Sequence, residues 1–278
     1  MKRLVLLLGA VAVLAVIFLR GKAGPTVISG RAMGCEWKLV TDEKVDRDEL
    51  QSRIPGVLEH WEQVLSTWRA DSDLSRHNRG EAATEDLSKV LALADHLRQE
   101  SGGAFDHRML GNLTAAGFGP GGSGIDLSSI GKGYAVDRVC EMLAGQGIHR
   151  HVFSLAGEVR AGAGSWPVEI ESPDPPTEVP GATIDLQNKA MATSGNYRQW
   201  NGEQDGKLVS HILDPTTGKP VLRPPCSVTV IGPDAALASG WATALFLLGP
   251  DRNPLAGSKS YQVIWKGSKD AWKAPGTP

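Results

Sequence analysis

The chain reads IDLSSIGKGYAVDR from Ile125 to Arg138. Its apolar start predicts the end of a strand that terminates in an acid, Asp126, and a loop of small residues then leads to a helix from Tyr134. Free N–H groups at a helix start, short side chains and the cation of Lys132 together favour phosphate binding. Because Gly133 follows that lysine, the stretch is not a Walker A motif. A tight strand-to-helix turn is the plainer interpretation of the stretch alone.

Apolar spacing on both sides of this stretch predicts helices and short strands. One helical stripe covers Asp48–Trp68 and is expected to be interrupted at Pro55–Gly56. Three further helices are expected at Asp86–Glu100, Tyr134–Leu143 and Asp234–Leu248. Strands are expected at Trp37–Val40, Val152–Leu155, Val168–Ser172, Thr183–Leu186 and Ser227–Ile231, with a terminal hairpin of Tyr261–Trp265 and Ala271–Lys273. Helices that precede a run of strands favour an α+β fold over a doubly wound sheet.

Length and composition indicate an ordinary globular domain. The 278 residues can bury one large core, 41% of them are hydrophobic, and the formal net charge is −2. Without a basic excess, nothing suggests nucleic-acid binding. Three cysteines, Cys35, Cys140 and Cys226, are too few and too scattered for a disulfide framework or a zinc site.

The N-terminus differs from the rest of the chain. Two basic residues precede sixteen apolar or glycine residues, Leu4–Leu19, and two more basic residues follow. We expect residues 1–23 to be an uncleaved signal-anchor with the folded part exported; a cleaved signal peptide is the alternative. The basic flanks argue against a buried core helix. Residues 24–32 are expected to be a linker, and 33–278 a single domain.

A glycine pair follows the second expected helix, in the segment Ser101–Asp106, which reads SGGAFD. The glycines allow a ligand to approach the backbone, Phe105 offers an aromatic surface, and Asp106 offers an acceptor for a ring or ribose donor. The plainer interpretation is a helix C-cap followed by a buried phenylalanine.

Two more segments carry candidate chemistry. His211 stands three residues before the strong turn signature Asp214–Gly218, and histidine is the commonest general base at neutral pH. Ser239 and Thr243 are four residues apart on the last helix and share one face. Their oxygens are candidate metal ligands, although hydroxyls bonded to the preceding helical turn are the ordinary interpretation.

Taken together, these segments resemble the ApbE family of FAD:protein FMN transferases and related periplasmic flavin-binding lipoproteins. The resemblance covers about Met33 to Gly249. It rests on MGC at residues 33–35, LSTWRADSDLSRHN at 65–78, SGGAFD at 101–106, IDLSSIGKGYAVDR at 125–138, ATSGNYRQW at 192–200, SHILDPTTGKP at 210–220 and SVTVIGPDAALASGWATALFLLG at 227–249.

The resemblance implies a T-fold-like α+β domain with antiparallel sheets and packed helices. It also implies that the protein binds FAD and, with Mg²⁺, cleaves its pyrophosphate. FMN is then attached through a phosphoester to a Thr or Ser hydroxyl of a target flavoprotein, and AMP leaves. With the N-terminal segment, it implies a place on the exported, periplasmic side of the cell inner membrane, or in the periplasm after cleavage.

The resemblance also implies a role for individual side chains. Those of the flavin pocket are Met33, Trp68 and the pocket wall Leu213. Those that hold the rest of FAD are Ala104, Phe105, Asp106, Asp126 and, near the phosphates, Lys132. The implied metal ligands are Ser129, through its carbonyl, and Thr243, and His211 is the implied base.

The sequence departs from the family pattern at the metal site. The family has an aspartate where this chain has Ser239, and a neutral replacement weakens a Mg²⁺ site. One hypothesis is an active transferase in which Asp126 or Glu158 supplies the missing charge. The alternatives are a flavin-binding protein that does not turn FAD over, and a FAD pyrophosphatase that uses water as acceptor. The glycine pair usual before the acid also begins with an alanine, Ala156, here.

Overall fold

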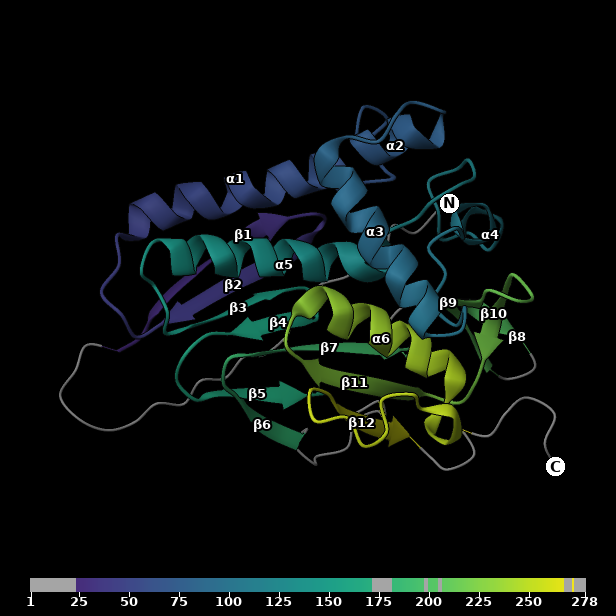
Figure 1. The fold of residues 1–278 in the computed structure, drawn as a ribbon. Coiled ribbons are helices and arrows are strands. Elements are labelled where there is room, and N and C mark those ends of the chain that lie inside the picture. The colour runs from purple at the N-terminus through teal and green to yellow at the C-terminus, as the bar shows by residue number, and fades with distance from the viewer. Residues whose placement is uncertain (1–23, 172–181, 198–199, 205–206, 268–271, 273–278) are drawn as a thin grey trace.

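The computed structural model describes residues 24–171, 182–197, 200–204, 207–267 and 272, and the described chain begins with a β-hairpin (Figure 1). Strand β1 (Thr26–Ala32) pairs antiparallel with β2 (Cys35–Thr41). The turn between them places Met33 and Gly34 at φ 50° and 71°. The expected linker at 24–32 is therefore wrong, because most of it forms an edge strand of the main sheet.

The N-terminal anchor expected at 1–23 lies outside the described residues. No helix within the described part is long and apolar enough to cross a membrane. The second strand of the expected terminal hairpin also lies largely outside the described residues. Its first strand is present as β12 (Gln262–Gly267), which pairs with β11 (Cys226–Gly232).

Six α-helices and one 3₁₀ helix, η1, occur in the described residues. They are α1 (Arg47–Leu65), α2 (Asp73–Asn78), α3 (Glu85–Glu100), α4 (Leu110–Ala115), α5 (Ser128–Gly145), α6 (Ala235–Leu248) and η1 (Pro250–Arg252). The longer helices α1, α3, α5 and α6 cover one face of the main sheet (Figure 1).

The described strands form three antiparallel sheets. The main sheet has seven strands in the order β1-β2-β3-β4-β7-β11-β12, a second has the order β10-β9-β8, and the third is the pair β5-β6. The strands not yet bounded are β3 (His151–Leu155), β4 (Glu158–Ala161), β5 (Trp166–Ile170), β6 (Ala182–Leu186), β7 (Lys189–Gly195), β8 (Trp200–Gln204), β9 (Lys207–Asp214) and β10 (Lys219–Leu222). The predicted α+β architecture, with an antiparallel sheet and packed helices, is confirmed.

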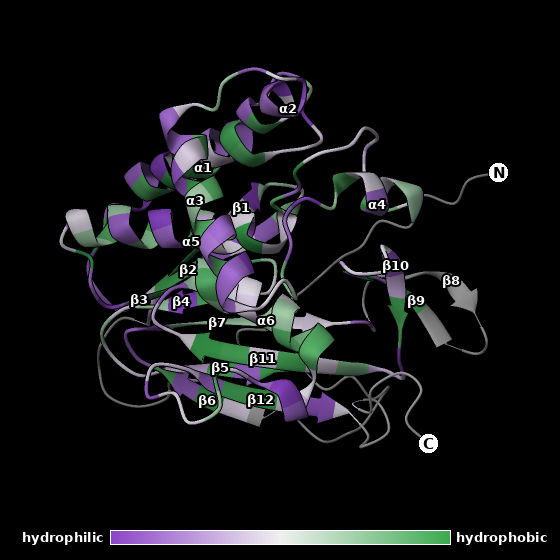
Figure 2. Cartoon of the chain, turned by 45° about the vertical axis from the view of Figure 1, so that its right-hand side comes forward, coloured by the Kyte–Doolittle hydropathy of each residue, from purple (hydrophilic) through white to green (hydrophobic). Residues whose placement is uncertain are grey.

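Successive residues of the main sheet face two different hydrophobic cores. On β2, Leu39 belongs to the core beneath the helices and Val40 to the core against β5 and β6. On β11, Val230 likewise belongs to the core beneath the helices and Ile231 to the core against β5 and β6. Because side chains alternate along a strand, one sheet can support a helical layer on one face and a small hairpin on the other. Figure 2 shows α6 and β11 as largely hydrophobic ribbons in this layered centre.

Helix α1 is continuous, contrary to the interruption expected at Pro55–Gly56. Proline within a helix costs about 3 kcal/mol because it removes a backbone hydrogen bond. Here Ile54 and Leu58, on either side of Pro55 and Gly56, are fully buried. Helix α1 packs on α5 and β1, and this burial outweighs the local cost.

Helix α5 begins at Ser128, six residues before the start expected at Tyr134. The small residues taken for a loop are its first turns, and Ile125 is not part of a strand. Close packing explains the glycine at position 133, because a Cβ there would lie 2.3 Å from the carbonyl oxygen of Ala235. The glycine therefore serves close packing of α5 against α6.

Candidate active site

One cavity of about 840 Å³ opens among α5, α6, β4, β7 and β9, with the segment after α3 on its rim. This volume is in the range of small-molecule and cofactor sites. Ten of the eleven residues to which the resemblance gives a role line it: Met33, Ala104, Phe105, Asp106, Asp126, Ser129, Lys132, His211, Leu213 and Thr243. Ser239, the candidate ligand that departs from the family pattern, lines it too. The fold thus gathers residues that are up to 210 positions apart in sequence. Their individual roles remain predictions.

Trp68 is the exception. Its side chain is 72% exposed and does not line the cavity. It follows the end of α1, where the Ser66 hydroxyl accepts the backbone N–H groups of Trp68 and Arg69 at 3.1 and 3.2 Å. The indole therefore lies outside the cavity in this structure, and a role for Trp68 in the flavin pocket stays a prediction.

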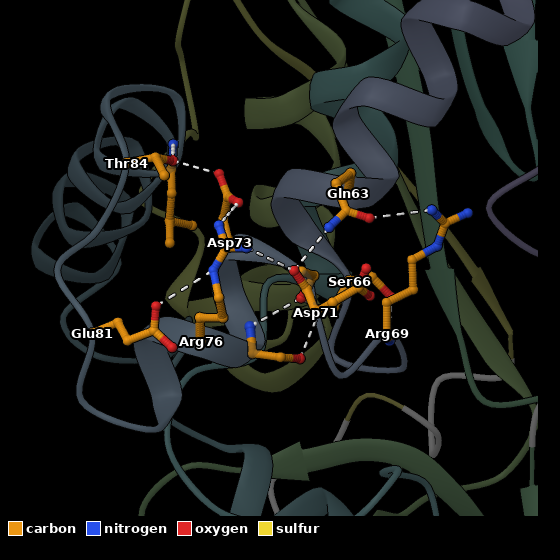
Figure 3. A network of polar contacts seen from close by, with 11 residues as sticks. Gln63, Ser66, Arg69, Asp71, Asp73, Arg76, Glu81 and Thr84 are labelled. Atoms are coloured by element: carbon orange, nitrogen blue, oxygen red, sulfur yellow. Dashed lines mark hydrogen bonds and ion pairs between the residues drawn. The ribbon is translucent and has the colours of Figure 1, made fainter.

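The segment around Trp68 is a polar network that joins α1 to α2 (Figure 3). The Ser66 carbonyl accepts hydrogen bonds from the hydroxyls of Ser72 and Ser75 at 2.5 and 3.2 Å. Asp73 accepts a hydrogen bond from Arg76 at 2.7 Å and one from Thr84 at 2.6 Å. The motif LSTWRADSDLSRHN thus forms the end of α1, the turn after it and helix α2.

The last residue of that motif contacts the cavity wall indirectly. Asn78 donates to the Ile125 carbonyl at 2.8 Å and accepts the Ile125 N–H at 2.8 Å. This paired contact fixes the backbone immediately before Asp126. The Asp126 carboxylate then accepts the Ser128 N–H at 3.0 Å, and also the Ser128 hydroxyl. Asp126 thereby satisfies one free backbone donor at the start of α5.

Asp106 is held by two arginines. Arg98 Nε donates to it at 3.0 Å, and the Arg108 guanidinium binds both of its oxygens at 3.0 and 2.9 Å. Burial alone would raise the pKa of Asp106, but the hydrogen bonds from Arg108 and Arg98 outweigh it and hold that pKa well below its usual range. Because its oxygens are already engaged, Asp106 acts first as an anchor for two guanidinium groups. Phe105 beside it is 2% exposed, so the plainer interpretation of SGGAFD also holds.

His211 lies on β9, close to the hairpin that joins β9 to β10. Asp214 shapes this hairpin, because its side chain accepts the Thr216 N–H at 2.8 Å and its carbonyl accepts the Gly218 N–H at 2.7 Å. The His211 imidazole meets the Phe118 ring edge to face, at a centroid distance of 6.2 Å. His211 thus presents its imidazole to the cavity beside this hydrogen-bonded turn.

An oxygen-rich cluster lies where α6 meets β4 and β7. The Ser239 hydroxyl donates to Glu158 Oε1 at 3.1 Å. The Thr243 hydroxyl donates to the Ser239 carbonyl at 3.3 Å and lies 3.3 Å from the Ser194 hydroxyl. All four side chains line the cavity. The bond from Thr243 to the Ser239 carbonyl is the ordinary contact of a helical hydroxyl with the preceding turn. Glu158, in addition, places a carboxylate beside Ser239.

Lys132 places a positive charge in the cavity. Its ammonium forms no hydrogen bond or ion pair with any described residue. Burial raises the pKa of the nearby Cys35 thiol, and the Lys132 charge partly opposes that rise. Cys35, Cys140 and Cys226 are all free thiols. The cavity thus offers a lysine to an anionic ligand.

Sequence reasoning missed the residue that places α6. Asp137 is 2% exposed, and its carboxylate accepts the backbone N–H groups of Ala235 and Ala236 at 2.9 to 3.0 Å. Arg160 on β4 donates to it at 2.5 Å. An acid eight residues before the C-terminal end of a helix gives no local signal of a long-range cap. The apolar neighbours of Asp137 in GYAVDR are the available hint that it is buried.

Comparison with known proteins agrees with this geometry. The ApbE family model matches residues 33–125 and 119–264. A FAD:protein FMN transferase of Vibrio cholerae is 31% identical over 275 residues, which is 81% of this chain and 82% of that protein. A FAD:protein FMN transferase of Klebsiella pneumoniae is 28% identical over 307 residues, covering 90% of this chain and 87% of that protein.

Solved structures of the same kind share the fold. The flavin transferase ApbE from Vibrio cholerae superimposes with a TM-score of 0.78 at 29% identity, covering 90% of this chain and 96% of that one. The flavinyl transferase ApbE of Pseudomonas stutzeri, in its apo form, gives 0.74 at 25% identity, covering 90% and 97%. A family match across most of the chain and an equally extensive structural match lead to one conclusion: this chain belongs to the ApbE family.

Proposed function

We propose that the protein is a FAD:protein FMN transferase. It cleaves the pyrophosphate of FAD, attaches FMN through a phosphoester to a Thr or Ser hydroxyl of a target flavoprotein, and releases AMP. One observation carries the proposal: a single cavity brings together Lys132, His211 and the oxygen cluster of Glu158, Ser239 and Thr243. The names of the relatives at 28% and 31% identity support it.

The cavity residues suit transfer of a phosphoryl group to a hydroxyl. Such a reaction requires a proton acceptor, a neutralising charge and precise positioning. His211 is the proton acceptor for the incoming hydroxyl, in line with the usual role of histidine near neutral pH. Lys132 balances the charge of the pyrophosphate, and the apolar surface of Phe105 and Leu213 accommodates the rings of the ligand.

The oxygen cluster also fits a magnesium ion, although no group of three or more His, Cys, Asp or Glu residues among the described ones forms a ready-made site. Mg²⁺ commonly binds through one or two carboxylates and completes its shell with water and substrate phosphates. Glu158 provides one carboxylate, and Ser239 and Thr243 provide neutral oxygens. When bound, Mg²⁺ would supply charge neutralisation on the pyrophosphate.

The serine at position 239 also supports a second candidate function. A site with one fewer anionic ligand binds a hard cation less well. A protein that holds FAD without cleaving it, as a carrier or assembly partner, is consistent with that loss. Hydrolysis of FAD to FMN and AMP is the third outcome that an assay must separate.

We further propose that the protein acts on the exported side of the inner membrane. The support is the apolar segment Leu4–Leu19 between basic residues. Cleavage of this segment would leave a periplasmic protein instead. Fractionation of cells with an antibody to the domain distinguishes the two.

One incubation tests the enzymatic proposal. The full-length chain is mixed with FAD, Mg²⁺ and a flavoprotein domain that bears an acceptor threonine. We expect fluorescent flavin on the denatured target and an equal amount of AMP, and we expect His211→Ala to abolish both. Free FMN with AMP would instead identify a pyrophosphatase, and unchanged FAD would identify a binding protein.

A further inference from the structure

We infer that Glu158 has taken over, in this chain, the anionic ligand position that Ser239 no longer fills. A divalent cation would then be held by a carboxylate from β4 together with hydroxyls from α6. The inference rests on the proposed function for the identity of the bound phosphates. It concerns only how this chain completes the cation site.

The contact between the two side chains carries the inference. Glu158 Oε1 and Ser239 Oγ lie 3.1 Å apart. In an octahedral Mg²⁺ shell with bonds of about 2.0–2.1 Å, neighbouring ligand oxygens are roughly 3 Å apart. The pair is therefore spaced as two adjacent ligands of one cation. The hydroxyls of Thr243 and Ser194 add a second oxygen pair, 3.3 Å apart, one helical turn away.

The Glu158 carboxylate is not neutralised by the protein. Its Oε1 accepts a hydrogen bond from the Ser239 hydroxyl, and its Oε2 accepts one from the Gly157 N–H at 3.3 Å. It forms no ion pair with a described residue. Leaving a partly buried carboxylate without a cation is unfavourable. A bound divalent ion would remove that cost.

The fold explains how this carboxylate reaches α6. Glu158 is the first residue of β4, directly after a turn in which Ala156 has φ 56°. Strand β4 pairs with β7, which places Val159 opposite Met191, and α6 packs over both strands. The turn therefore projects the first side chain of β4 toward the helix.

Two other acids, Asp126 and Asp234, have different tasks. Asp126 is occupied at the start of α5, where it accepts two donors from Ser128. Asp234 caps the start of α6, where it accepts the Leu237 N–H at 2.8 Å. Among these candidates, Glu158 alone has an oxygen bonded to Ser239.

Binding of Mn²⁺ to the full-length protein tests the inference without relying on activity. The free Mn²⁺ signal in electron paramagnetic resonance gives the dissociation constant, with and without FAD. We expect Glu158→Gln to weaken binding at least about tenfold, because the site loses its carboxylate. The double variant Glu158→Gln/Ser239→Asp should recover most of the affinity, because the charge returns on α6.

Glu36→Gln is the matched control, because Glu36 also lines the cavity but lies on β2 beside Arg31, at 3.7 Å. It should leave the Mn²⁺ affinity within about twofold of the parent. The inference is overturned if Glu158→Gln behaves like this control. It is equally overturned if Glu158→Gln, folded by circular dichroism, loses affinity that Ser239→Asp does not restore. Mn²⁺ binding that follows the expected pattern, without flavin on the target, would contradict the transferase proposal alone.

Discussion

Arg160 on β4 and Asp137 on α5 form an ion pair of 2.5 Å, and the same carboxylate caps the first turn of α6. The Asp137 side chain is 3% exposed and that of Arg160 is 27% exposed. One acid thus connects a strand and two helices that line the cavity.

We predict that Asp137→Asn lowers the free energy of unfolding by about 2–4 kcal/mol, because Arg160 keeps its charge in a largely buried place and α6 loses an anionic cap. Urea unfolding followed by circular dichroism measures the change. Glu141→Gln is the control, because Glu141 forms an exposed pair with Arg138, and exposed pairs contribute at most about 1 kcal/mol. Equal effects of the two changes would refute the capping role.

The close packing of α5 on α6 gives a second prediction. A Cβ on Gly133 would lie 2.3 Å from the Ala235 carbonyl oxygen, whereas one on Gly145 of the same helix would meet nothing within 4 Å. Gly133→Ala should therefore destabilise the fold by about 1–3 kcal/mol or more through overpacking. Gly145→Ala should stabilise it by up to about 1 kcal/mol, because alanine favours the helix. Thermal unfolding of both variants provides the comparison, and a stabilising Gly133→Ala would show that the helices do not need this contact.

The arginine clamp on Asp106 predicts a pH dependence. Because the pKa of Asp106 is lowered in the folded state, its ionised carboxylate stabilises the fold. This stabilisation is fully present above the ordinary pKa of about 4 and is lost as the pH falls toward the lower pKa of the folded state. At neutral pH, Asp106→Asn should cost about 1–3 kcal/mol. Urea unfolding of parent and variant should give a constant difference from pH 8 to about 5 that shrinks below about pH 4. A difference that grows on acidification would contradict the clamp.

Left-handed backbone at Ala156 gives a fourth prediction. A non-glycine residue at φ 56° costs about 1–2 kcal/mol, partly offset by the lower chain entropy of alanine in the unfolded state. Ala156→Gly should therefore stabilise the protein by about 0.5–1 kcal/mol. The same change at exposed Ala144 in α5 should destabilise it by about 1 kcal/mol. Melting temperatures that move in the same direction would show that Ala156 is not strained.

Local sequence patterns predicted the central elements well. The helix expected at Asp234–Leu248 and the strand expected at Ser227–Ile231 agree with α6 and β11 to within a residue at each end. These segments are apolar along most of their length and end at capping or turn residues. Strand β1 was missed because Ile28 is its one buried residue and Gly30 interrupts the apolar pattern. Its pairing with β2 therefore decides its structure.

The candidate site was predictable as a set of residues but not as a geometry. The resemblance implied ten of the residues that line the cavity, including His211 and Lys132. The contact of Glu158 with Ser239 and the exposure of Trp68 depend on how distant elements pack, which local spacing does not record. The early start of α5 was hidden because Gly133 serves packing against α6 rather than a loop.

If this cavity binds FAD, titration of flavin-free protein with FAD should quench the flavin fluorescence in a saturable way. Ala104→Trp should abolish the quenching, because Ala104 lines the cavity. Ala144→Trp should preserve it, because Ala144 is exposed on α5. Absence of saturable quenching, or quenching that Ala104→Trp leaves unchanged in a folded protein, would contradict FAD binding in this cavity.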